Sequence, residues 1–340
     1  MEVQRIDPDD GAIFSRWFAL WRLTDLELWP DVPGWDEREL GAMARQRGRA
    51  REHHLLAAVE GDGSLVGVAL MEVPLLDNRH SVGIDVRVHP EHRREGIGTR
   101  LVAEVASRAH ALGRAMLNGY FEVPTAQLAG HPAEPFARSQ GFAALLLGNR
   151  RHLDLPFDPE RMARLTDELA QVPGADAYRM LTFTTPWPDE YMEDQCEMAR
   201  RMSTDEPSGD EHHEEEVWDA ARVKESDDLL AAQGLTKLAA VAQHIDSGRL
   251  VAFSEIVVSG ARPVDAWQWA TLVLSEHRGH RLGLAVKLAN LEFLATVMPT
   301  ARRLITGNAQ ENTPMIAVND LMGFEVVATG TFWQKTLGPG

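Results

Sequence analysis

The sequence has a single cysteine, Cys196, among 340 residues. One thiol excludes an internal disulfide framework, and no cluster of metal-ligating residues accompanies it, so neither a disulfide scaffold nor a structural zinc is expected. This usage is typical of the reducing cytoplasm, which is the location we expect. The chain also lacks a signal-peptide pattern and any apolar run long enough to span a bilayer.

Positive charge is scarce as well. Lys and Arg together number 34 against 51 Asp and Glu, which gives a formal net charge of −17. Nucleic acid and anionic membranes are therefore disfavoured as partners, because both carry dense negative charge. The lysines are Lys224, Lys237, Lys287 and Lys335. The acidic stretch 205–216 is a candidate rim for a cationic substrate, although a solvated loop explains the same pattern.

The chain does contain a clear strand–loop–helix pattern. β-Branched residues alternate over 82–88, a basic loop with two glycines follows, and from Ile97 the apolar residues recur at helical spacing. Such a loop presents free backbone N–H groups at the positive end of a helix, a geometry that suits a pyrophosphate. Its glycines let the backbone approach a ligand closely.

The same layout occurs a second time, over 270–287. Arg93 aligns with Arg278 at an offset of 185 residues (278 − 93), and the Gly-Phe pair at 141–142 aligns with the pair at 323–324 at an offset of 182 (323 − 141). Nearly equal offsets at two landmarks indicate a duplicated domain, and the length of the chain is ordinary for two domains.

An Arg-x-x-Gly-x-Gly loop after a strand, with a Gly-Phe pair further along, resembles the GNAT acyl-CoA N-acyltransferases, and the two copies cover nearly all of the chain. The resemblance implies an α/β (α+β) fold with two tandem GNAT-fold domains. Each would be a mixed, mostly antiparallel twisted sheet flanked by helices, with a splayed central strand pair. We expect an N-terminal domain at 1–156, a linker helix at 157–174 and a C-terminal domain at 175–340.

The resemblance also implies an activity. We expect an N-acetyltransferase that moves an acetyl group from acetyl-CoA, its co-substrate, to a primary amine of a small molecule by direct attack in a ternary complex, without a metal. The C-terminal copy is the favoured catalytic domain. Two alternatives stay open: a catalytically silent acyl-CoA-binding sensor or scaffold, and activity in the N-terminal copy. A monomer or homodimer is expected.

The two loops and one further segment are the expected acyl-CoA site. The first loop contributes Val88, Arg93, Arg94, Gly96, Gly98 and Thr99, and the second contributes Val273, Arg278, Gly279, His280, Arg281, Gly283 and Leu284. Arg281 stands where the family has its first glycine. Asn308, Asn312 and Met315 of the second copy resemble positions that contact pantetheine and the phosphate arm, and Asn312 also suits a helix N-cap. The first copy lacks both asparagines.

Two glutamates are the candidate general bases. Glu255 and Glu72 occupy equivalent points in apolar strands, where a buried carboxyl has a raised pKa, although alternate residues of a strand also simply face water. Asp85 is a further candidate in the first copy. The family's acid is a tyrosine four residues before the Gly of Gly-Phe, but Ala137 and Asn319 stand there. Neither can protonate a thiolate, so the acid is unassigned.

Overall fold

The computed structural model describes residues 1–31, 34–205 and 214–338. The chain divides into two compact units. Unit 1 contains Met1–Leu147 and the stretch that starts at Ala328, and unit 2 lies within Gly148–Val327. Each unit has a hydrophobic core of its own, so each is described by itself.

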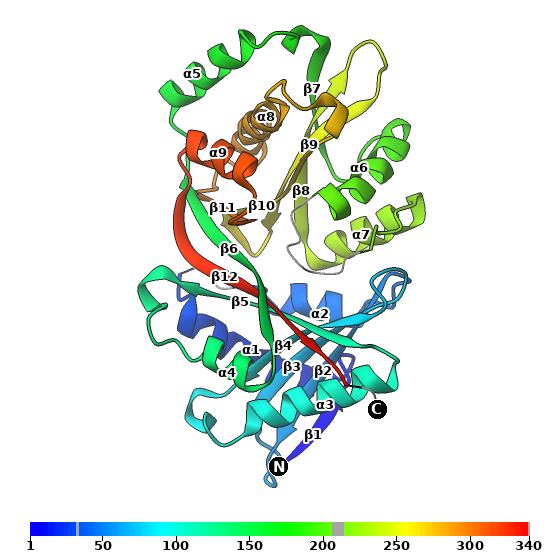
Figure 1. The fold of residues 1–340 in the computed structure, drawn as a ribbon, viewed down its shortest axis with the longest axis vertical. Coiled ribbons are helices and arrows are strands. Elements are labelled where there is room, and N and C mark those ends of the chain that lie inside the picture. The colour runs from blue at the N-terminus through cyan, green and yellow to red at the C-terminus, as the bar shows by residue number, and fades with distance from the viewer. Residues whose placement is uncertain (32–33, 206–213, 339–340) are drawn as a thin grey trace. The chain divides into compact units, whose positions relative to one another are not determined.

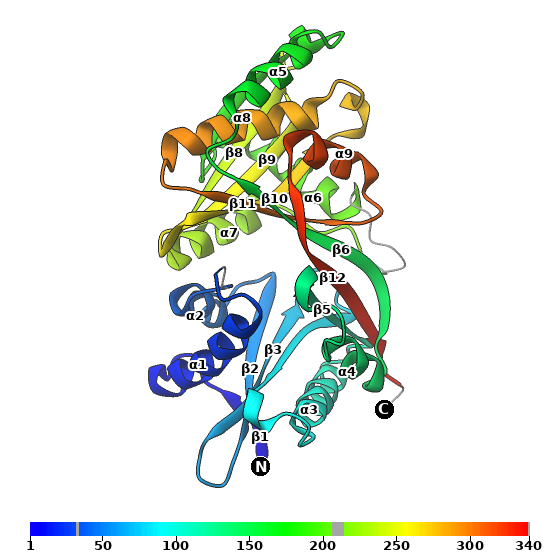
Figure 2. The same ribbon diagram turned by 90° about the vertical axis from the view of Figure 1, so that its left-hand side faces the viewer.

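Unit 1 is a twisted sheet with helices on both faces. Its elements are β1 (Glu2–Ile6), α1 (Gly11–Leu28), α2 (Glu37–Arg45), β2 (Arg51–Val59), β3 (Leu65–Pro74), β4 (Ser81–Val88), α3 (Ile97–Ala111), β5 (Met116–Pro124) and α4 (Ala133–Ser139). The described strands follow the order β1-β2-β3-β4-β5-β12, where β12 is Glu325–Thr336. Neighbouring strands are antiparallel except β4 and β5, which are parallel. Helices α1 and α2 cover one face and α3 and α4 the other (Figure 1, Figure 2).

Local sequence signals explain where the helices of unit 1 begin and why they pack. Asp10 caps α1 by accepting hydrogen bonds from the backbone of its first turn. Asp36 and Glu39 form a complete capping box at α2. The aromatic face of α1 is buried, and the indole Nε1 of Trp17 donates to the Leu56 carbonyl at 2.8 Å, which fastens the helix to β2.

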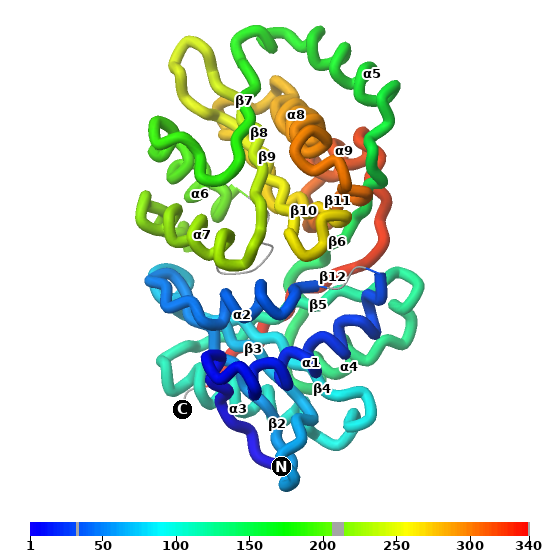
Figure 3. Tube along the Cα trace, turned by 180° about the vertical axis from the view of Figure 1, so that it is seen from behind, coloured from blue at the N-terminus to red at the C-terminus, as the bar shows by residue number. Residues whose placement is uncertain are grey.

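Unit 2 repeats this plan. Its elements are β6 (Ala143–Asp154), α5 (Pro159–Ala170), β7 (Tyr178–Thr184), α6 (Met192–Asp205), α7 (Ala220–Gln233), β8 (Leu235–His244), β9 (Leu250–Ser259), β10 (Arg262–Val273), α8 (Leu282–Val297), β11 (Arg303–Ala309) and α9 (Thr313–Met322). Strand order is β6-β11-β10-β9-β8-β7, with β10 and β11 as the parallel pair. Helices α6 and α7 lie on one face, and α8 and α9 lie on the other (Figure 3).

The closing strand of each sheet comes from the other half of the chain. In β6, residues Gly148–Asp154 pair antiparallel with β11, and in β12, residues Ala328–Thr336 pair antiparallel with β5. The sequence predicts two short strands at each of these places, 143–147 with 151–155 and 324–329 with 332–336. Those predictions are wrong: each is one continuous strand, because the residues expected to turn are extended and hydrogen-bonded to the partner. The domain limits at 156 and 175 follow chain order and stay a prediction.

Because β12 pairs with β5 of unit 1, a mutation in the buried part of β12 should destabilise unit 1. Trp333 is 3% exposed and its ring stacks on Phe121, with Arg138 over its face. Trp333→Ala should therefore cost about 3–5 kcal/mol of stability in unit 1. Hydrogen exchange should speed up in β5 and α4, while α8 and α9 keep their protection. Val326→Ala, at an exposed position of the same strand, is the control. If α9 lost as much hydrogen-exchange protection as β5, this assignment of β12 to unit 1 would be contradicted.

Candidate functional site

The parallel strand pair of each unit stays hydrogen-bonded for only part of its length. In unit 1, β4 and β5 pair from Ser81 opposite Met116 to Ile84 opposite Gly119. In unit 2, pairing runs from Asp265 opposite Arg303 to Gln268 opposite Thr306. Beyond these points the strands separate, so backbone N–H and C=O groups on the facing edges lose their partner across the pair. These are the splayed strands that the family resemblance implies.

Of the two openings between parting parallel strands, the one between β10 and β11 in unit 2 is bordered by a β-bulge. Gln268 lies opposite Ile256, but Thr271 lies opposite Ser254, so β10 has one extra residue there relative to β9. In unit 1 the corresponding β3–β4 register runs without a shift from Gly67 opposite Val88 to Glu72 opposite Gly83. A bulge leaves the extra residue out of the ladder and turns its backbone groups in a new direction.

A buried polar network fixes this bulge. The side-chain Nε2 of Gln268 donates to the carbonyls of Glu255 (2.7 Å) and Ala270 (3.1 Å), which lie on either side of the bulge. Asn290 of α8, fully buried, donates to the Ser254 carbonyl at 2.8 Å. The irregular backbone is thus held by hydrogen bonds from buried side chains, which fix its geometry.

The two loops that are expected to bind the phosphates of acyl-CoA, at 93–98 and 278–283, share one backbone conformation. The first loop has left-handed residues at Arg94 (φ 70°) and Gly96 (φ 80°), and the second has them at Gly279 (φ 90°) and Arg281 (φ 54°). The offset is 185 in both cases (279 − 94 and 281 − 96). Each loop therefore has one glycine and one arginine at the two left-handed positions, in opposite order. Arg281 keeps the conformation of the glycine it replaces, at a cost of about 1–2 kcal/mol.

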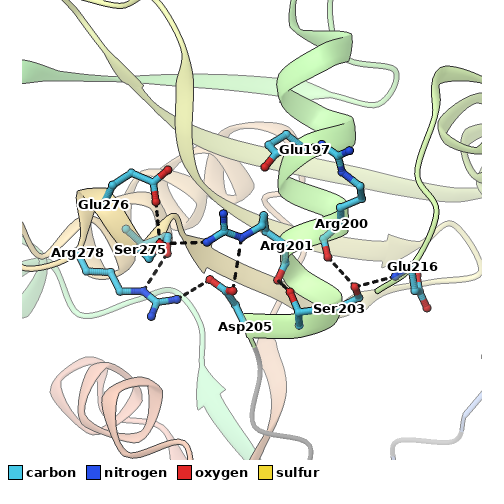
Figure 4. A network of polar contacts seen from close by, with 11 residues as sticks. Glu197, Arg200, Arg201, Ser203, Asp205, Glu216, Ser275, Glu276 and Arg278 are labelled. Carbon is cyan, nitrogen blue, oxygen red and sulfur yellow. Dashed lines mark hydrogen bonds and ion pairs between the residues drawn. The ribbon is translucent and has the colours of Figure 1, made fainter. Parts of the chain in front are cut away.

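The loop arginines are engaged by acidic residues at the ends of helices. Arg93 forms two hydrogen bonds with Glu27 of α1, at 2.9 and 2.5 Å. Arg278 contacts Asp205, the end of α6, at 2.7 Å, and Arg201 lies 3.6 Å from the same carboxylate (Figure 4). In both units a carboxylate thus sits where an anionic phosphate would meet the arginine, and a bound phosphate would have to compete with it.

The other loop residues mix open and tightly packed positions. Val88 and Val273 end β4 and β10, and the Val273 carbonyl accepts from Arg278 Nε at 3.2 Å. Gly98 lies where a Cβ would be 2.9 Å from the Phe136 ring, whereas the same atom at Gly283 would have only ordinary contacts. The remaining members are Thr99, which accepts from Gln140, His280, within 3.3 Å of the Pro173 carbonyl, and Leu284, which is buried.

Linker helix α5 also reaches the second loop. Arg281 NH1 lies 3.2 Å from Glu168 of α5. Leu165 of the same helix is buried in the core of unit 2, so α5 is packed on this unit.

The asparagines of the second copy lie in and beside the gap. Asn312 is the N-cap of α9, and its side chain accepts from the backbone N–H of Met315 at 3.2 Å, which confirms the capping expectation. Asn308 lies on β11 two residues past the last pair with β10. Its Oδ1 accepts from Asn319 Nδ2 at 3.2 Å.

Sequence reasoning passed over Lys287, which contacts Asn319 on the side away from Asn308. It is 1% exposed, and its Nζ donates to Asn319 Oδ1 at 2.8 Å. Burial alone lowers the pKa of Lys287 to about 7. A lysine within the apolar face of a helix is the sequence signal, since Leu284 and Leu291, one turn away on the same face, are buried too.

The candidate bases of unit 1 are tied into ion pairs. Burial of the Glu72 carboxyl works to raise its pKa, but His53 and Arg51 outweigh burial and lower it to about 2, which makes a weak base near neutral pH. Asp85 is bonded to Arg87, whose guanidinium also pairs with Asp25 at 3.0 Å. This arginine occupies the face of β4 on the α1 side.

Glu255 lies on the α6–α7 face of unit 2 and is paired with Lys237 at 2.9 Å, both side chains being largely buried. Sequence reasoning missed Asp227 of α7, which interacts electrostatically with both. Burial raises the pKa of Asp227; Lys237 lowers it and Glu255 raises it. Its Oδ1 atom is buried and accepts no hydrogen bond from the described chain. On this face Lys237 therefore pairs with Glu255 and also acts electrostatically on Asp227.

The acidic stretch at 205–216 can be followed in part, because residues 206–213 lie outside the described ones. Asp205 binds Arg278, and Glu216 binds Arg222 at 3.0 Å. These two carboxylates thus serve cations of the chain itself. In the described part of the chain, no group of three or more His, Cys, Asp or Glu side chains is placed to hold a metal. None of the described helices has the length and apolar character needed to cross a membrane.

Two sheets of this order, each with a parting parallel pair and a glycine-containing loop before a helix, define the class as a tandem GNAT-fold acyltransferase. The sequence comparison agrees: residues 14–146 match the family model for the Acetyltransferase (GNAT) family. The match covers the first GNAT-fold copy, and unit 2 repeats the same strand order.

Particular proteins are similar over most or all of the chain. A mycothiol acetyltransferase of Stackebrandtia nassauensis is 28% identical over 241 residues, which are 69% of this chain and 68% of that one. A solved tandem GNAT protein from the clavulanic acid biosynthesis pathway superposes with a TM-score of 0.81 at 27% identity, covering 100% of this chain and 99% of that one. A GCN5-related N-acetyltransferase from Sphaerobacter thermophilus shares the fold, with a TM-score of 0.63 at 16% identity, 100% of this chain and 96% of that one.

The lowered pKa of Lys287 predicts a pH-dependent stability. The unfolded lysine has a pKa of about 10.4, so between pH 7 and 10 the unfolded chain binds the extra proton and stability rises with pH. The charged form is therefore most costly below pH 7. Lys287→Met should alter the free energy of unfolding differently at the two ends of this range. Its effect should be about 2–3 kcal/mol more stabilising at pH 6 than at pH 9. Denaturant unfolding at both pH values measures it, and the exposed Lys224→Met is the control. The same change at both pH values would contradict the lowered pKa.

Proposed function

We propose that the protein is an N-acetyltransferase that uses acetyl-CoA, with catalysis in unit 2. The observation that carries the proposal is the bulged, side-chain-braced opening between β10 and β11. Free backbone donors beside a separated strand pair suit a thioester carbonyl, which gains negative charge as an amine attacks it. Unit 1 has a similar opening, but no bulge borders it, and it lacks asparagines equivalent to Asn308 and Asn312.

The chemistry needs a base and a polarised carbonyl. The neutral amine attacks the carbonyl carbon and forms a C–N bond, the C–S bond breaks, and its electron pair leaves with the sulfur of CoA. The proton lost by the amine goes to a carboxylate, for which Glu255 is the first candidate and Asp227 the second. Both lie on the α6–α7 face of unit 2, whereas Asn308 lies on the side of α8 and α9, so acceptor and donor would enter from opposite faces.

The acceptor is proposed to be a small primary amine, such as an amino sugar or an aminoglycoside-type antibiotic. The two carboxylates near Lys237 suit a cationic ammonium, which then loses its proton to one of them. The mycothiol acetyltransferase and the clavulanic acid pathway protein support a small-molecule acceptor for this chain. We propose no nucleic-acid or membrane partner, and a monomer or homodimer.

Unit 1 is proposed to hold acyl-CoA without turning it over. Its loop has the same left-handed backbone as the loop of unit 2, and its arginine is equally placed. On the side of α1, however, Arg87 and its two carboxylate partners fill the face where an amine would have to enter. With Glu72 held at a pKa of about 2, no strong base remains among the candidates of this unit.

Calorimetric titration with acetyl-CoA separates the two loops. Arg278→Ala and Arg93→Ala each remove one charge-assisted contact to phosphate, and each should weaken one site by about tenfold or more. The proposal requires that Arg278→Ala weaken the site whose occupancy supports turnover. Arg249→Ala, an arginine of unit 2 outside the loops that pairs with Asp194, is the control. If only Arg93→Ala removed binding and turnover together, unit 1 would be the catalytic unit.

Substitution of the carboxylates identifies the base. Glu255→Gln should lower kcat by the factor of about 10²–10⁴ that general-base catalysis contributes, with the affinity for acetyl-CoA unchanged. Free CoA thiol is measured with acetyl-CoA and a panel of amino sugars and aminoglycosides. Exposed Glu292→Gln of α8 is the matched control. An unchanged rate in Glu255→Gln with a lost rate in Asp227→Asn would transfer the role to Asp227.

A further inference from the structure

A chain of side-chain hydrogen bonds runs from a buried cation to the gap in unit 2. Lys287 Nζ donates to Asn319 Oδ1 (2.8 Å), Asn319 Nδ2 donates to Asn308 Oδ1 (3.2 Å), and Asn308 Nδ2 donates to the Ala309 carbonyl (2.9 Å). Lys287 and Asn319 are 1% and 0% exposed. The chain links α8, α9 and β11 and ends at the separated edge of β11.

Every hydrogen bond in this chain points the same way, and the ammonium is the reason. A lysine can only donate, so the oxygen of Asn319, and not its nitrogen, must face it. The Asn319 NH₂ group is then directed at Asn308, whose oxygen turns to accept and whose NH₂ group is left pointing along β11. One charge thus fixes the orientation of two amides, and it also polarises them in sequence.

Among the described residues no carboxylate forms an ion pair with Lys287, which argues against a purely structural ion pair. Burial is the one cause behind its lowered pKa in the described chain. Two charged side chains on the helices packed against α8 are bound elsewhere: Arg161 of α5 donates to the Met322 carbonyl, and Asp320 of α9 accepts from Arg151. The Nζ atom of Lys287 also lies 5.1 Å from the centroid of the Phe324 ring. A lysine buried at this cost, with a neutral amide and an aromatic ring rather than a carboxylate as its partners in the described chain, points to a role beyond packing.

We propose that Lys287 is a positioning residue for acyl transfer: acting through Asn319, it holds the Asn308 amide as an N–H donor toward the thioester end of the bound acyl-CoA and strengthens it as negative charge collects on the departing sulfur. The proposal rests on the function proposed for unit 2. Asn319 stands at the position where the resemblance leads one to expect an acid, so the site replaces a proton donor with a polarised amide.

No proton travels along the chain in this step. The C–S bond breaks, its electron pair stays on the sulfur, and the thiolate is stabilised by the Asn308 N–H and by the positive charge behind it. The sulfur is protonated afterwards by water. An amide group can pass polarisation along a chain of hydrogen bonds, but it need not give up a proton to do so.

The test compares Lys287→Met with wild type, using acetyl-CoA and the amine that the panel identifies. The variant should lose about 10–100-fold in kcat, the effect typical of a group that orients a functional ligand from behind, while the Kd for acetyl-CoA stays within about threefold. Wild type should lose kcat as pH rises through about 7, where Lys287 gives up its charge, and the variant should lack this alkaline limb. Lys224→Met, exposed on α7, should behave as wild type.

A double-mutant cycle keeps the inference falsifiable if one variant folds poorly. Asn319→Leu should reproduce the kcat loss of Lys287→Met, and the double variant should be no slower than either single variant, because all three break the same chain. Additive losses, or a Lys287→Met profile that keeps the alkaline limb, would overturn the positioning role and leave the acyltransferase intact. A wild-type protein that binds acetyl-CoA but transfers its acyl group to no amine in the panel would instead overturn the proposed function, and this inference with it.

Discussion

The two central strands of each sheet stop pairing halfway along, and the candidate site depends on that interruption. A parallel pair normally satisfies its backbone groups along its whole length, so separated edges are costly unless something else meets them. In unit 2 the cost is contained by side chains: Gln268 and Asn290 brace the bulge on one edge, and Asn308 stands on the other. These hydrogen bonds therefore fix the backbone on both edges of the opening.

The sequence was sufficient for the features that repeat or that depend on local chemistry. The two loops and the Asn312 cap lie where their residues predict, and the splayed strands lie where the family resemblance implies them. The long-range pairing of β6 and β12 could not be read from the chain, because a strand's own residues state that it is extended but not which edge it joins. The breaks expected at 148–150 and 330–331 lie within continuous strands.

The site itself shows the same limit. Glu255 could be named from its place in an apolar strand, but its pairing with Lys237 and the proximity of Asp227 come from three elements that only the fold assembles. Lys287 was visible as a lysine in a buried helix, and its partner Asn319 was noted only for the tyrosine it replaces. The link between them crosses from α8 to α9, and no spacing in the sequence encodes it.

The exchanged strands also set an order of events during synthesis. β5 ends at Pro124 and β12 begins at Glu325, so the ribosome makes 200 residues between them. During that time the edge of β5 is open, with a row of backbone donors and acceptors able to template pairing with another chain. Unit 2, whose closing strand β6 is made before the rest of it, can complete its sheet as soon as β11 emerges. The half of the protein that is translated first is thus completed last, and its exposed edge is where a nascent chain would need protection.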